Sequence, residues 1–576
     1  MTNEEQRKKK SVEKFEELCK WSKNSGFDLK SYSQTHNEST SVSPKIDLLL
    51  FLIVTLVSFY CRLWRLSEPS EVIFDEVHFG KFTNWYLKGE YFFDIHPPLA
   101  KLILAMVARA CSFDPTFGFD SISAEYPSNI NYTCLRMAPS IVSSLIAPVL
   151  YLTIREIGCS VYGAALAALM IAFENSLIVE SRMIVTDAFL IFFLSLTVLF
   201  LIKSTKYKPF TTRWYLFTAV SSAGLACSIS VKLTALGVGA ALAIFQILIV
   251  LSSSSRNATQ SSFIDLIKHY AIKASIVIGT TVAIFLACYY FHFELLPYHG
   301  TGDVFMSHQF RLSLSDKDNA PRQSQIGVQT FWEKFFHLNQ VMHNSNMAIN
   351  TTHPYSSKWY QWPLFMGTAV NYWDKWVSID GDNLRKRIYC MGNPITWWLV
   401  ALGIFLIAIS LFLFAVSIVF SRMRNVNLHE IIILKNNNNN IRKKENEKRK
   451  LIKKTFISYT RFNYFIDHID NYLEIIVFLF FGYILSLIPF VLITRVTWLY
   501  HYLPSLLFGI LSFSFIYDLL LKIFIKKKYF KLIITMIIIS LITFGWYFFR
   551  PLTYGLPLSN ENFQKRMWLE NWRPNK

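Results

Sequence analysis

Carboxylates and histidines gather in a short segment that follows the first apolar stretch of the chain. Asp75 and Glu76 are adjacent, His78 follows them, and Asp94 and His96 come soon after. Neighbouring side chains point in different directions on a helix or a strand, so Asp75 and Glu76 cannot face each other as the paired carboxylates of a glycosidase do. They can divide the work: Asp75 as the general base for a hydroxyl proton, and Glu76 as a group that orients the acceptor or a cationic neighbour. An interfacial loop with simply hydrated carboxylates is the alternative.

Cationic and hydroxyl side chains in other segments suit an anionic leaving group. A reaction that releases an anionic group such as a phosphate needs fixed cations to stabilise the charge that this group gains. The residues predicted to bind this phosphate are Arg136, Arg182, Lys232, Arg495, Tyr500 and His501. Arg495 and Arg136 are the preferred pair. Each cation could instead extend towards lipid headgroups.

Other candidate residues carry weaker signals. Asp187 opens an apolar segment, where it could cap a helix or belong to the site. His78, His96 and His353 lack the spacing of a tetrahedral zinc set and are interpreted as hydrogen-bonding loop residues near the site. The Asp-Gly-Asp sequence at 380–382 has the form that holds a metal in nucleotide-sugar transferases, although a turn is the preferred interpretation. The sequence shows no required cofactor and leaves metal dependence open.

Two cysteines share one predicted loop with a glycosylation sequon. Cys111 and Cys134 could form a disulfide in an oxidising compartment. The sequons at Asn131 and Asn350 fall in loops on the same predicted face and are expected to be usable there.

The elements that must position these residues are apolar segments long enough to cross a membrane. The chain has 576 residues, of which 52% are hydrophobic and 17% charged, whereas soluble domains have roughly 45–50% and about 25%. A span needs about 20 apolar residues. The clear segments are Ile46–Arg62, Ile184–Leu201, Leu233–Leu251, Ala274–Phe291, Trp397–Phe420, Ile475–Ile493, Leu503–Ile523 and Leu532–Phe549. The sequence therefore predicts an all-α polytopic membrane protein rather than a set of soluble domains.

Three weaker segments are rich in small residues. They are Arg136–Ile154, Val161–Phe173 and Trp214–Ser230. Small side chains allow close helix packing inside a bundle, so we expect these helices to be buried. They raise the count to about eleven spans.

The basic residues indicate how the spans are oriented. With eleven spans, the tail 1–45, the loop 203–213, the segment 422–472 and the run 526–528 all fall on one face, which the positive-inside rule makes cytosolic. The net charge of +19 is thus read as a topology signal rather than as nucleic-acid binding. The N-terminus is expected in the cytosol, and the first loop 63–135 and the C-terminus in the lumen.

The same segments define the expected domains. The predicted order is a cytosolic basic tail (1–45), an N-terminal membrane region (46–292) that contains the catalytic loop 63–135, a long lumenal loop (293–395), a C-terminal membrane region (396–550) with a disordered cytosolic insert (421–472), and a lumenal tail (551–576).

Several segments resemble the protein O-mannosyltransferases. DEVHFGKF begins at Asp75, FFDIHPPLAKLI contains Asp94, ESRMIVTD ends at Asp187, and RVTWLYHYLP begins at Arg495. LRMAPSI, SVK, GTGDVFMSHQF, HPYSSKWYQWPL and GNPITWW occur in the family's order. The resemblance implies a class C glycosyltransferase fold with eleven spans and a lumenal site. It also implies that mannose passes from dolichyl phosphate mannose to Ser or Thr hydroxyls, with Asp75 as the base.

One departure from the family concerns the long lumenal loop. Eukaryotic members usually carry MIR repeats there, but only Arg311–Thr352 separates the flanking motifs in this chain. The sequence therefore resembles a short member without that domain. The resemblance implies the endoplasmic reticulum membrane, a dolichyl-phosphate donor, Ser/Thr-containing acceptor polypeptides and a homo- or heterodimer with a related transferase.

Two other functions fit fewer features. A multispan transporter or lipid flippase would use the lumenal charges as a binding site, but it predicts internal repeats and ionisable residues at mid-span, and the charges here lie at segment ends. A sister lipid-phosphate-sugar glycosyltransferase with another acceptor would share the chemistry and differ only in its loop motifs.

Overall fold

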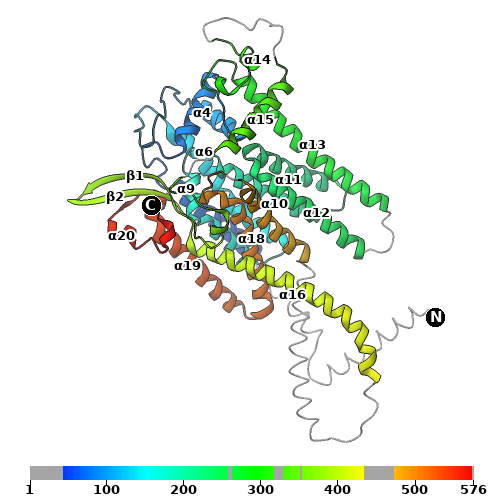
Figure 1. Cartoon of the computed structure of the whole chain (residues 1–576). Helices are drawn as coiled ribbons and strands as arrows, with labels where there is room; N and C mark the ends of the chain where they lie inside the picture. Colours follow the sequence, from blue (N-terminus) through cyan, green and yellow to red (C-terminus); the bar gives the residue numbers. More distant parts are fainter. Residues whose placement is uncertain are drawn as a thin grey trace.

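Apolar helices form the body of the molecule (Figure 1). The structure is a computed structural model that describes residues 43–573 except 257–262, 317–328, 350–352, 434–471 and 494. In this part, nine helices are long and apolar enough to cross a membrane. They are α3 (Pro44–Leu63), α6 with α7 (Tyr132–Ser144 and Ile146–Ile157), α10 (Asp187–Thr205), α11 (Thr212–Val231), α13 (Phe263–Leu295), α16 (Pro394–Ile433), the helix Tyr472–Leu492, α18 (Leu503–Phe524) and α19 (Lys528–Tyr554).

Two further apolar elements complete the predicted set. The helices α8 (Val161–Ala172) and α9 (Asn175–Ser181) form a pair that is bent by 55°. The short apolar helix Leu233–Phe245 occupies the start of α12 (Leu236–Arg256). The eleven predicted segments coincide with the nine spans, this bent pair and this short helix. The prediction of a helical, multi-pass membrane protein is therefore confirmed.

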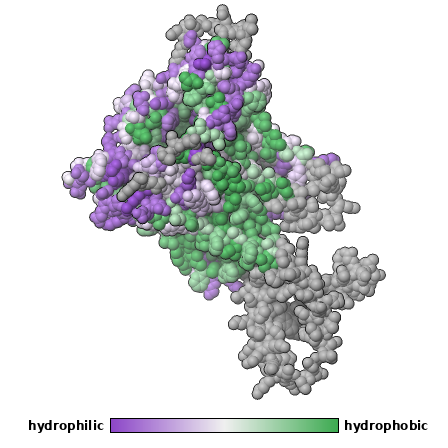
Figure 2. Space-filling view, in the orientation of Figure 1, coloured by the Kyte–Doolittle hydropathy of each residue, from purple (hydrophilic) through white to green (hydrophobic). Residues whose placement is uncertain are grey.

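Burial separates the inner helices from the outer ones. In the most apolar window, 67% of residues are buried for α6 with α7 and 61% for α11, against 22% for α3 and 11% for α13. Almost all of α8 is buried as well. The prediction that the Ala-, Gly- and Ser-rich segments lie inside the bundle is therefore confirmed. The outer helices present a broad hydrophobic surface, which Figure 2 shows in green.

Polar contacts at one end of the bundle show which helix ends share a side. Arg155, at the end of α7, pairs with Asp47 of α3 (2.7 Å). Glu156 pairs with Lys206, which follows α10 (2.6 Å), and Lys522 of α18 donates to a carbonyl in the α7–α8 turn (3.0 Å). The start of α3, the basic 203–213 loop and the basic run after α18 therefore lie on one side, as predicted.

The opposite side carries short helices and a small sheet. The helices are α4 (Glu76–Lys88), α5 (Leu99–Ala110), α14 (His308–Arg311), α15 (Phe331–Ala348) and α20 (Asn560–Gln564). Strands β1 (Val370–Ile379), β2 (Asp382–Cys390) and β3 (Pro557–Leu558) form an antiparallel sheet in that order. The all-α prediction missed this sheet. Because β3 belongs to it, the C-terminal segment lies on the same side as α4, in the hydrophilic part of Figure 2.

The Asp-Gly-Asp sequence at 380–382 forms the turn of the β1–β2 hairpin. Asp380 and Gly381 have φ angles of +52° and +85°, the positive values that a two-residue hairpin turn requires. The preferred interpretation of this sequence as a turn is confirmed.

Two predicted regions meet the edges of the described structure. Helix α16 continues to Ile433, beyond Phe420 where the span was expected to end, so residues 421–433 are helical rather than part of the predicted insert. Residues 434–471 of that insert, most of the basic tail and the sequon at Asn350 lie outside the described residues.

Candidate active site

Glu76 forms the centre of a fully paired cluster. It is the first residue of α4 and is 0% exposed. Its two carboxylate oxygens each accept a hydrogen bond of 2.8 Å from Arg136 of α6. They also accept from the backbone N–H groups of Ile73 (2.9 Å) and Ile184 (3.1 Å) and from the Tyr126 hydroxyl (3.1 Å). Of the predicted roles for Glu76, orienting a cationic neighbour fits these contacts, and contacting the acceptor does not.

Arg136 occupies a different place from the predicted one. Besides Glu76, its guanidinium donates to the carbonyls of Pro69 (2.7 Å) and Glu71 (2.9 Å). It also lies over the Tyr132 ring at 4.9 Å, and it is 0% exposed. A guanidinium enclosed by these partners does not face a phosphate, so the predicted phosphate contact is corrected to a buried ion pair with Glu76.

Arg182 likewise has a structural partner in place of a phosphate. Its guanidinium donates to the carbonyls of Arg62 (3.0 Å), Trp64 (2.6 Å) and Arg65 (2.8 Å). These carbonyls end α3, where a cation also interacts favourably with the helix dipole. The Tyr554 ring lies 4.8 Å below the guanidinium. Arg182 thus caps α3, and its predicted donor-binding role is corrected.

Asp75, by contrast, is half-buried and its carboxylate forms no hydrogen bond with any described residue. Burial raises the pKa of the Asp75 carboxyl to about 6, and it outweighs the opposing positive charges of His78 and Lys232. The negative charges of Asp187 and Asp94 raise the pKa further. A carboxylate with a pKa near the operating pH is suited to general-base chemistry.

Lys232 and Asp187 form an ion pair beside Asp75. The Lys232 ammonium, at the end of α11, lies 2.8 and 2.7 Å from the two Asp187 oxygens at the start of α10. It also lies 5.5 Å from the centre of the Tyr500 ring. This geometry agrees with the prediction that these residues belong to one cluster. Asp187 acts as the partner of Lys232 rather than as a helix cap.

Arg495 is a predicted phosphate ligand for which the structure shows no other role. It lies in the short connection between the helix Tyr472–Leu492 and α18, and it is half-buried. It forms no ion pair or hydrogen bond with the part of the chain that the structure describes. The Arg495 charge lies close enough to act on His96 and His501, and Asp94 and Tyr500 act on Arg495 in turn.

Asp94 and His96 belong to a turn that Lys101 holds in place. The Lys101 ammonium pairs with Asp94 and donates to the carbonyls of His96 (2.7 Å) and Pro97 (3.2 Å). Burial, together with the charges of Lys232, Lys101 and Arg495, holds the pKa of His96 well below its usual range. His96 is therefore neutral at physiological pH, and the hydrogen bonding predicted for its ring stays a prediction.

The remaining histidines have different surroundings. His78 is exposed on α4. The rings of His353 and Trp498 meet edge to face at 4.6 Å, and the backbone N–H of Trp498 donates to Nδ1 of His501 (2.9 Å). Thus His353 and His501 converge on Trp498, and His501 uses one ring nitrogen within its own turn.

A buried group that sequence reasoning missed lies behind Asp75. The Tyr372 hydroxyl of β1 donates to Glu180 of α9, and the Cys390 thiol of β2 lies 3.7 Å from the same Glu180 oxygen. All three residues are at most 2% exposed. The available signal was the position of Glu180 as the first residue of ESRMIVTD, one of the segments singled out in the sequence.

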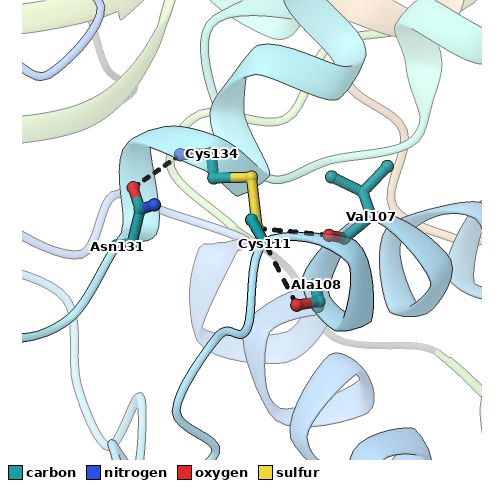
Figure 3. Close-up of a disulfide and its surroundings, with 5 residues drawn as sticks. All are labelled: Val107, Ala108, Cys111, Asn131 and Cys134. Carbon is teal, nitrogen blue, oxygen red and sulfur yellow. Dashed lines mark hydrogen bonds between the residues drawn. A yellow bond between two sulfur atoms is a disulfide. The ribbon is translucent and has the colours of Figure 1, made fainter.

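The disulfide between Cys111 and Cys134 is present (Figure 3). It joins the end of α5 to the first turn of α6, where Asn131 caps the helix by accepting from the Cys134 backbone N–H (3.2 Å). This bond ties α5, which follows the Asp94 segment, to α6, which carries Arg136.

Comparisons with known proteins identify the family. Residues 52–297 match the family described as dolichyl-phosphate-mannose-protein mannosyltransferase, and residues 331–572 match the C-terminal four-transmembrane region of protein O-mannosyltransferases. Dolichyl-phosphate-mannose–protein mannosyltransferase 4 of Schizosaccharomyces pombe is 32% identical over 53% of this chain and 39% of its own length. Protein O-mannosyl-transferase 1 of Rattus norvegicus is 32% identical over 47% of this chain and 36% of its own length.

A solved structure has the same architecture. The Saccharomyces cerevisiae protein O-mannosyltransferase Pmt1-Pmt2 complex bound to the sugar donor matches with a TM-score of 0.73 and 20% identity over 94% of both chains. The match to curated relatives, however, spans only about two fifths of their length. With both halves matched to one family and the fold shared, the chain belongs to the protein O-mannosyltransferases and has the predicted class C glycosyltransferase fold.

Proposed function

We propose that this protein transfers mannose from dolichyl phosphate mannose to Ser or Thr hydroxyls of polypeptides, with inversion at the anomeric carbon. The observation that carries the proposal is the environment of Asp75, a carboxylate that has no hydrogen-bond or ion-pair partner among the described residues and has a pKa of about 6 beside the Lys232–Asp187 pair. The names of the curated relatives support the choice of donor and acceptor.

The base step follows from this environment. The ionised Asp75 carboxylate accepts the proton of the acceptor hydroxyl, and the hydroxyl oxygen attacks the anomeric carbon from the face opposite the phosphate. The bond from that carbon to the phosphate oxygen breaks, and dolichyl phosphate leaves with the bonding electrons. A pKa of about 6 keeps Asp75 mostly ionised at neutral pH while making it a stronger base than an ordinary carboxylate.

Arg495 is the group that we assign to the departing phosphate. Its planar guanidinium can donate to two phosphate oxygens at once. No described residue forms a hydrogen bond or an ion pair with it. Lys232 contributes a fixed positive charge, although Asp187 holds its ammonium at 2.7 Å. The nearby start of α18 adds backbone N–H groups that favour an anion.

We place the enzyme in the endoplasmic reticulum membrane, with its N-terminus in the cytosol and the site and C-terminus in the lumen. The support is that the described basic loops lie on the side opposite the site. Glycosylation mapping should find Asn131 and Asn350 modified by the lumenal machinery, and cytosolic protease should cut within Asn436–Asn440. Protection of that segment in sealed microsomes would contradict this orientation.

We also propose pairing with a related transferase, because the matched solved structure is a complex of two such chains. Co-expression with tagged related transferases, followed by purification in mild detergent, should recover the two chains together. A purified single chain that transfers mannose at the full rate would contradict the need for a partner.

The direct test of the function uses microsomes from cells that express the chain. They receive labelled dolichyl phosphate mannose and a Ser/Thr-containing peptide, and a peptide with Ala at those positions is the control. Label should move to the Ser/Thr peptide alone, and the mannose linked to the peptide should have the opposite anomeric configuration to that in the donor. Label that moves to a non-protein acceptor would favour the sister glycosyltransferase instead.

A further inference from the structure

The residue before Asp75 has a strained backbone. Phe74 has a φ angle of +39°, in the left-handed region that bulky side chains rarely adopt. Such a conformation persists only where the surrounding structure holds it, and it is often associated with functional sites. The contacts of the Phe74 side chain show what holds it.

Two aromatic rings clamp Phe74. It stacks on Tyr372 of β1 with ring centres 4.1 Å apart and planes within 5°, and it meets Trp498 edge to face at 6.2 Å. Tyr372 is 2% exposed, and its hydroxyl donates to the equally buried Glu180 of α9. The sheet and the segment before α18 therefore contact this one side chain, and α9 holds the Tyr372 ring that stacks on it.

Asp75 lies between this clamp and a second fixed point. On its C-terminal side, Glu76 is anchored by Arg136 and two backbone N–H groups. The Asp75 carboxylate itself has no hydrogen-bond partner among the described residues. Its direction must therefore come from the backbone on either side, and Phe74 fixes one of those sides.

We propose that Tyr372 is a positioning residue for Asp75: its ring clamps Phe74, and Glu180 fixes that ring through the Tyr372 hydroxyl. This inference rests on the proposed base role of Asp75. A small displacement of a reacting group can lower the rate about 10²-fold without removing any chemical group. Loss of the clamp should therefore reduce kcat and leave donor binding unchanged.

The test compares two substitutions of Tyr372 with a matched control. Tyr372→Leu removes the stack, whereas Tyr372→Phe keeps the ring and removes only the hydroxyl. Tyr389 of β2 is the control, because it is also buried in the hairpin (6% exposed) but packs on Phe563 instead of Phe74. Each variant is assayed in microsomes for donor binding, kcat and KM, and rates are normalised to folded protein.

We expect Tyr372→Leu to lower kcat by about 10- to 100-fold with unchanged donor affinity. Tyr372→Phe keeps the stack and loses only the hydroxyl that Glu180 holds, so its kcat should fall by less than that of Tyr372→Leu, and Tyr389→Leu should keep the wild-type rate. Equal losses in Tyr372→Leu and Tyr389→Leu would show that the hairpin has only a structural role and would overturn the proposal. If Tyr372→Leu does not fold, Phe74→Leu takes its place, since it removes the same stack from the other side.

The outcomes also separate this inference from the proposed function. Wild-type protein that transfers no mannose would overturn the function itself. Wild-type protein that transfers mannose, with Tyr372→Leu and Phe74→Leu equally active, would leave the function intact and overturn the positioning role alone.

Discussion

The Glu76 and Asp75 regions differ in how completely their charges are paired. Glu76 is 0% exposed and accepts hydrogen bonds from Arg136, two backbone N–H groups and Tyr126. Asp75, its neighbour in the chain, is half-buried, and its carboxylate has no hydrogen-bond partner among the described residues. One carboxylate is thus built into the core, and the other is left available.

Two adjacent carboxylates can therefore have separate tasks. A buried ion pair that loses one partner leaves an uncompensated charge, so Glu76 contributes to stability. Asp75 is destabilised in its ionised form, because the folded protein raises its pKa from 3.8 to about 6. Groups of this kind persist for chemistry and often reduce stability.

The largest effect is expected for Asp75→Asn. Removal of a general base typically lowers the rate about 10²- to 10⁴-fold, and the amide cannot accept the hydroxyl proton. Because the raised pKa means that ionised Asp75 opposes folding at neutral pH, the variant should be at least as thermally stable as the wild type. A variant that transfers mannose normally would contradict the base role, and one that loses stability would contradict the unpaired state.

Glu76→Gln should have its main effect on stability. Breaking a buried ion pair costs about 3–5 kcal/mol, because Arg136 keeps its charge and loses its partner. Thermal unfolding in detergent should show a lower Tm, and the yield in membranes should fall. Arg136→Gln should lose a similar amount, and the double variant should lose less than the sum of the two. Additive losses would mean that the pair is not coupled.

Arg495→Lys keeps a positive charge but loses the planar guanidinium. Removal of one donor from a desolvated, developing charge costs on the order of 2–4 kcal/mol in the transition state, so turnover should fall while Tm stays constant. Arg182→Lys is the matched control, since Arg182 caps α3 and its loss should lower Tm instead. Near-normal turnover in Arg495→Lys would indicate that Arg495 only reaches towards lipid headgroups.

The smallest effect concerns pH. The base works only when ionised, so the rate should fall as the pH drops through the Asp75 pKa of about 6. Well below that pKa, the rate should fall about tenfold for each further pH unit. The same limb should be absent from the residual activity of Asp75→Asn. A wild-type limb near pH 4, the value of an exposed carboxylate, would show that Asp75 is not buried during the reaction.

The sequence predicted the spans well because each span depends on its own composition. It also placed Lys232 and Asp187 near Asp75, since all three lie at segment ends on one predicted face. The hairpin could have been predicted as well: residues 370–390 contain an Asp-Gly pair between two strands, which is a strong hairpin signal.

Contacts between distant segments could not be predicted. Glu76 and Arg136 are 60 residues apart, and Glu180 and Tyr372 are 192 residues apart. A single sequence shows that an arginine lies at the correct membrane depth. It does not show whether the guanidinium donates to a carboxylate, to the carbonyls of a helix end or to a phosphate. Arg136 and Arg182 were misassigned for this reason, whereas Arg495 remains a predicted phosphate ligand.

The most direct measurement compares Asp75→Asn with Glu76→Gln in the same membranes. Donor binding and single-turnover mannosyl transfer are measured for each, and both are normalised to the amount of folded protein. We expect Asp75→Asn to bind dolichyl phosphate mannose and to fail to transfer its mannose. Folded Glu76→Gln should both bind this donor and transfer its mannose. Transfer by Asp75→Asn together with loss of transfer in folded Glu76→Gln would contradict this expectation.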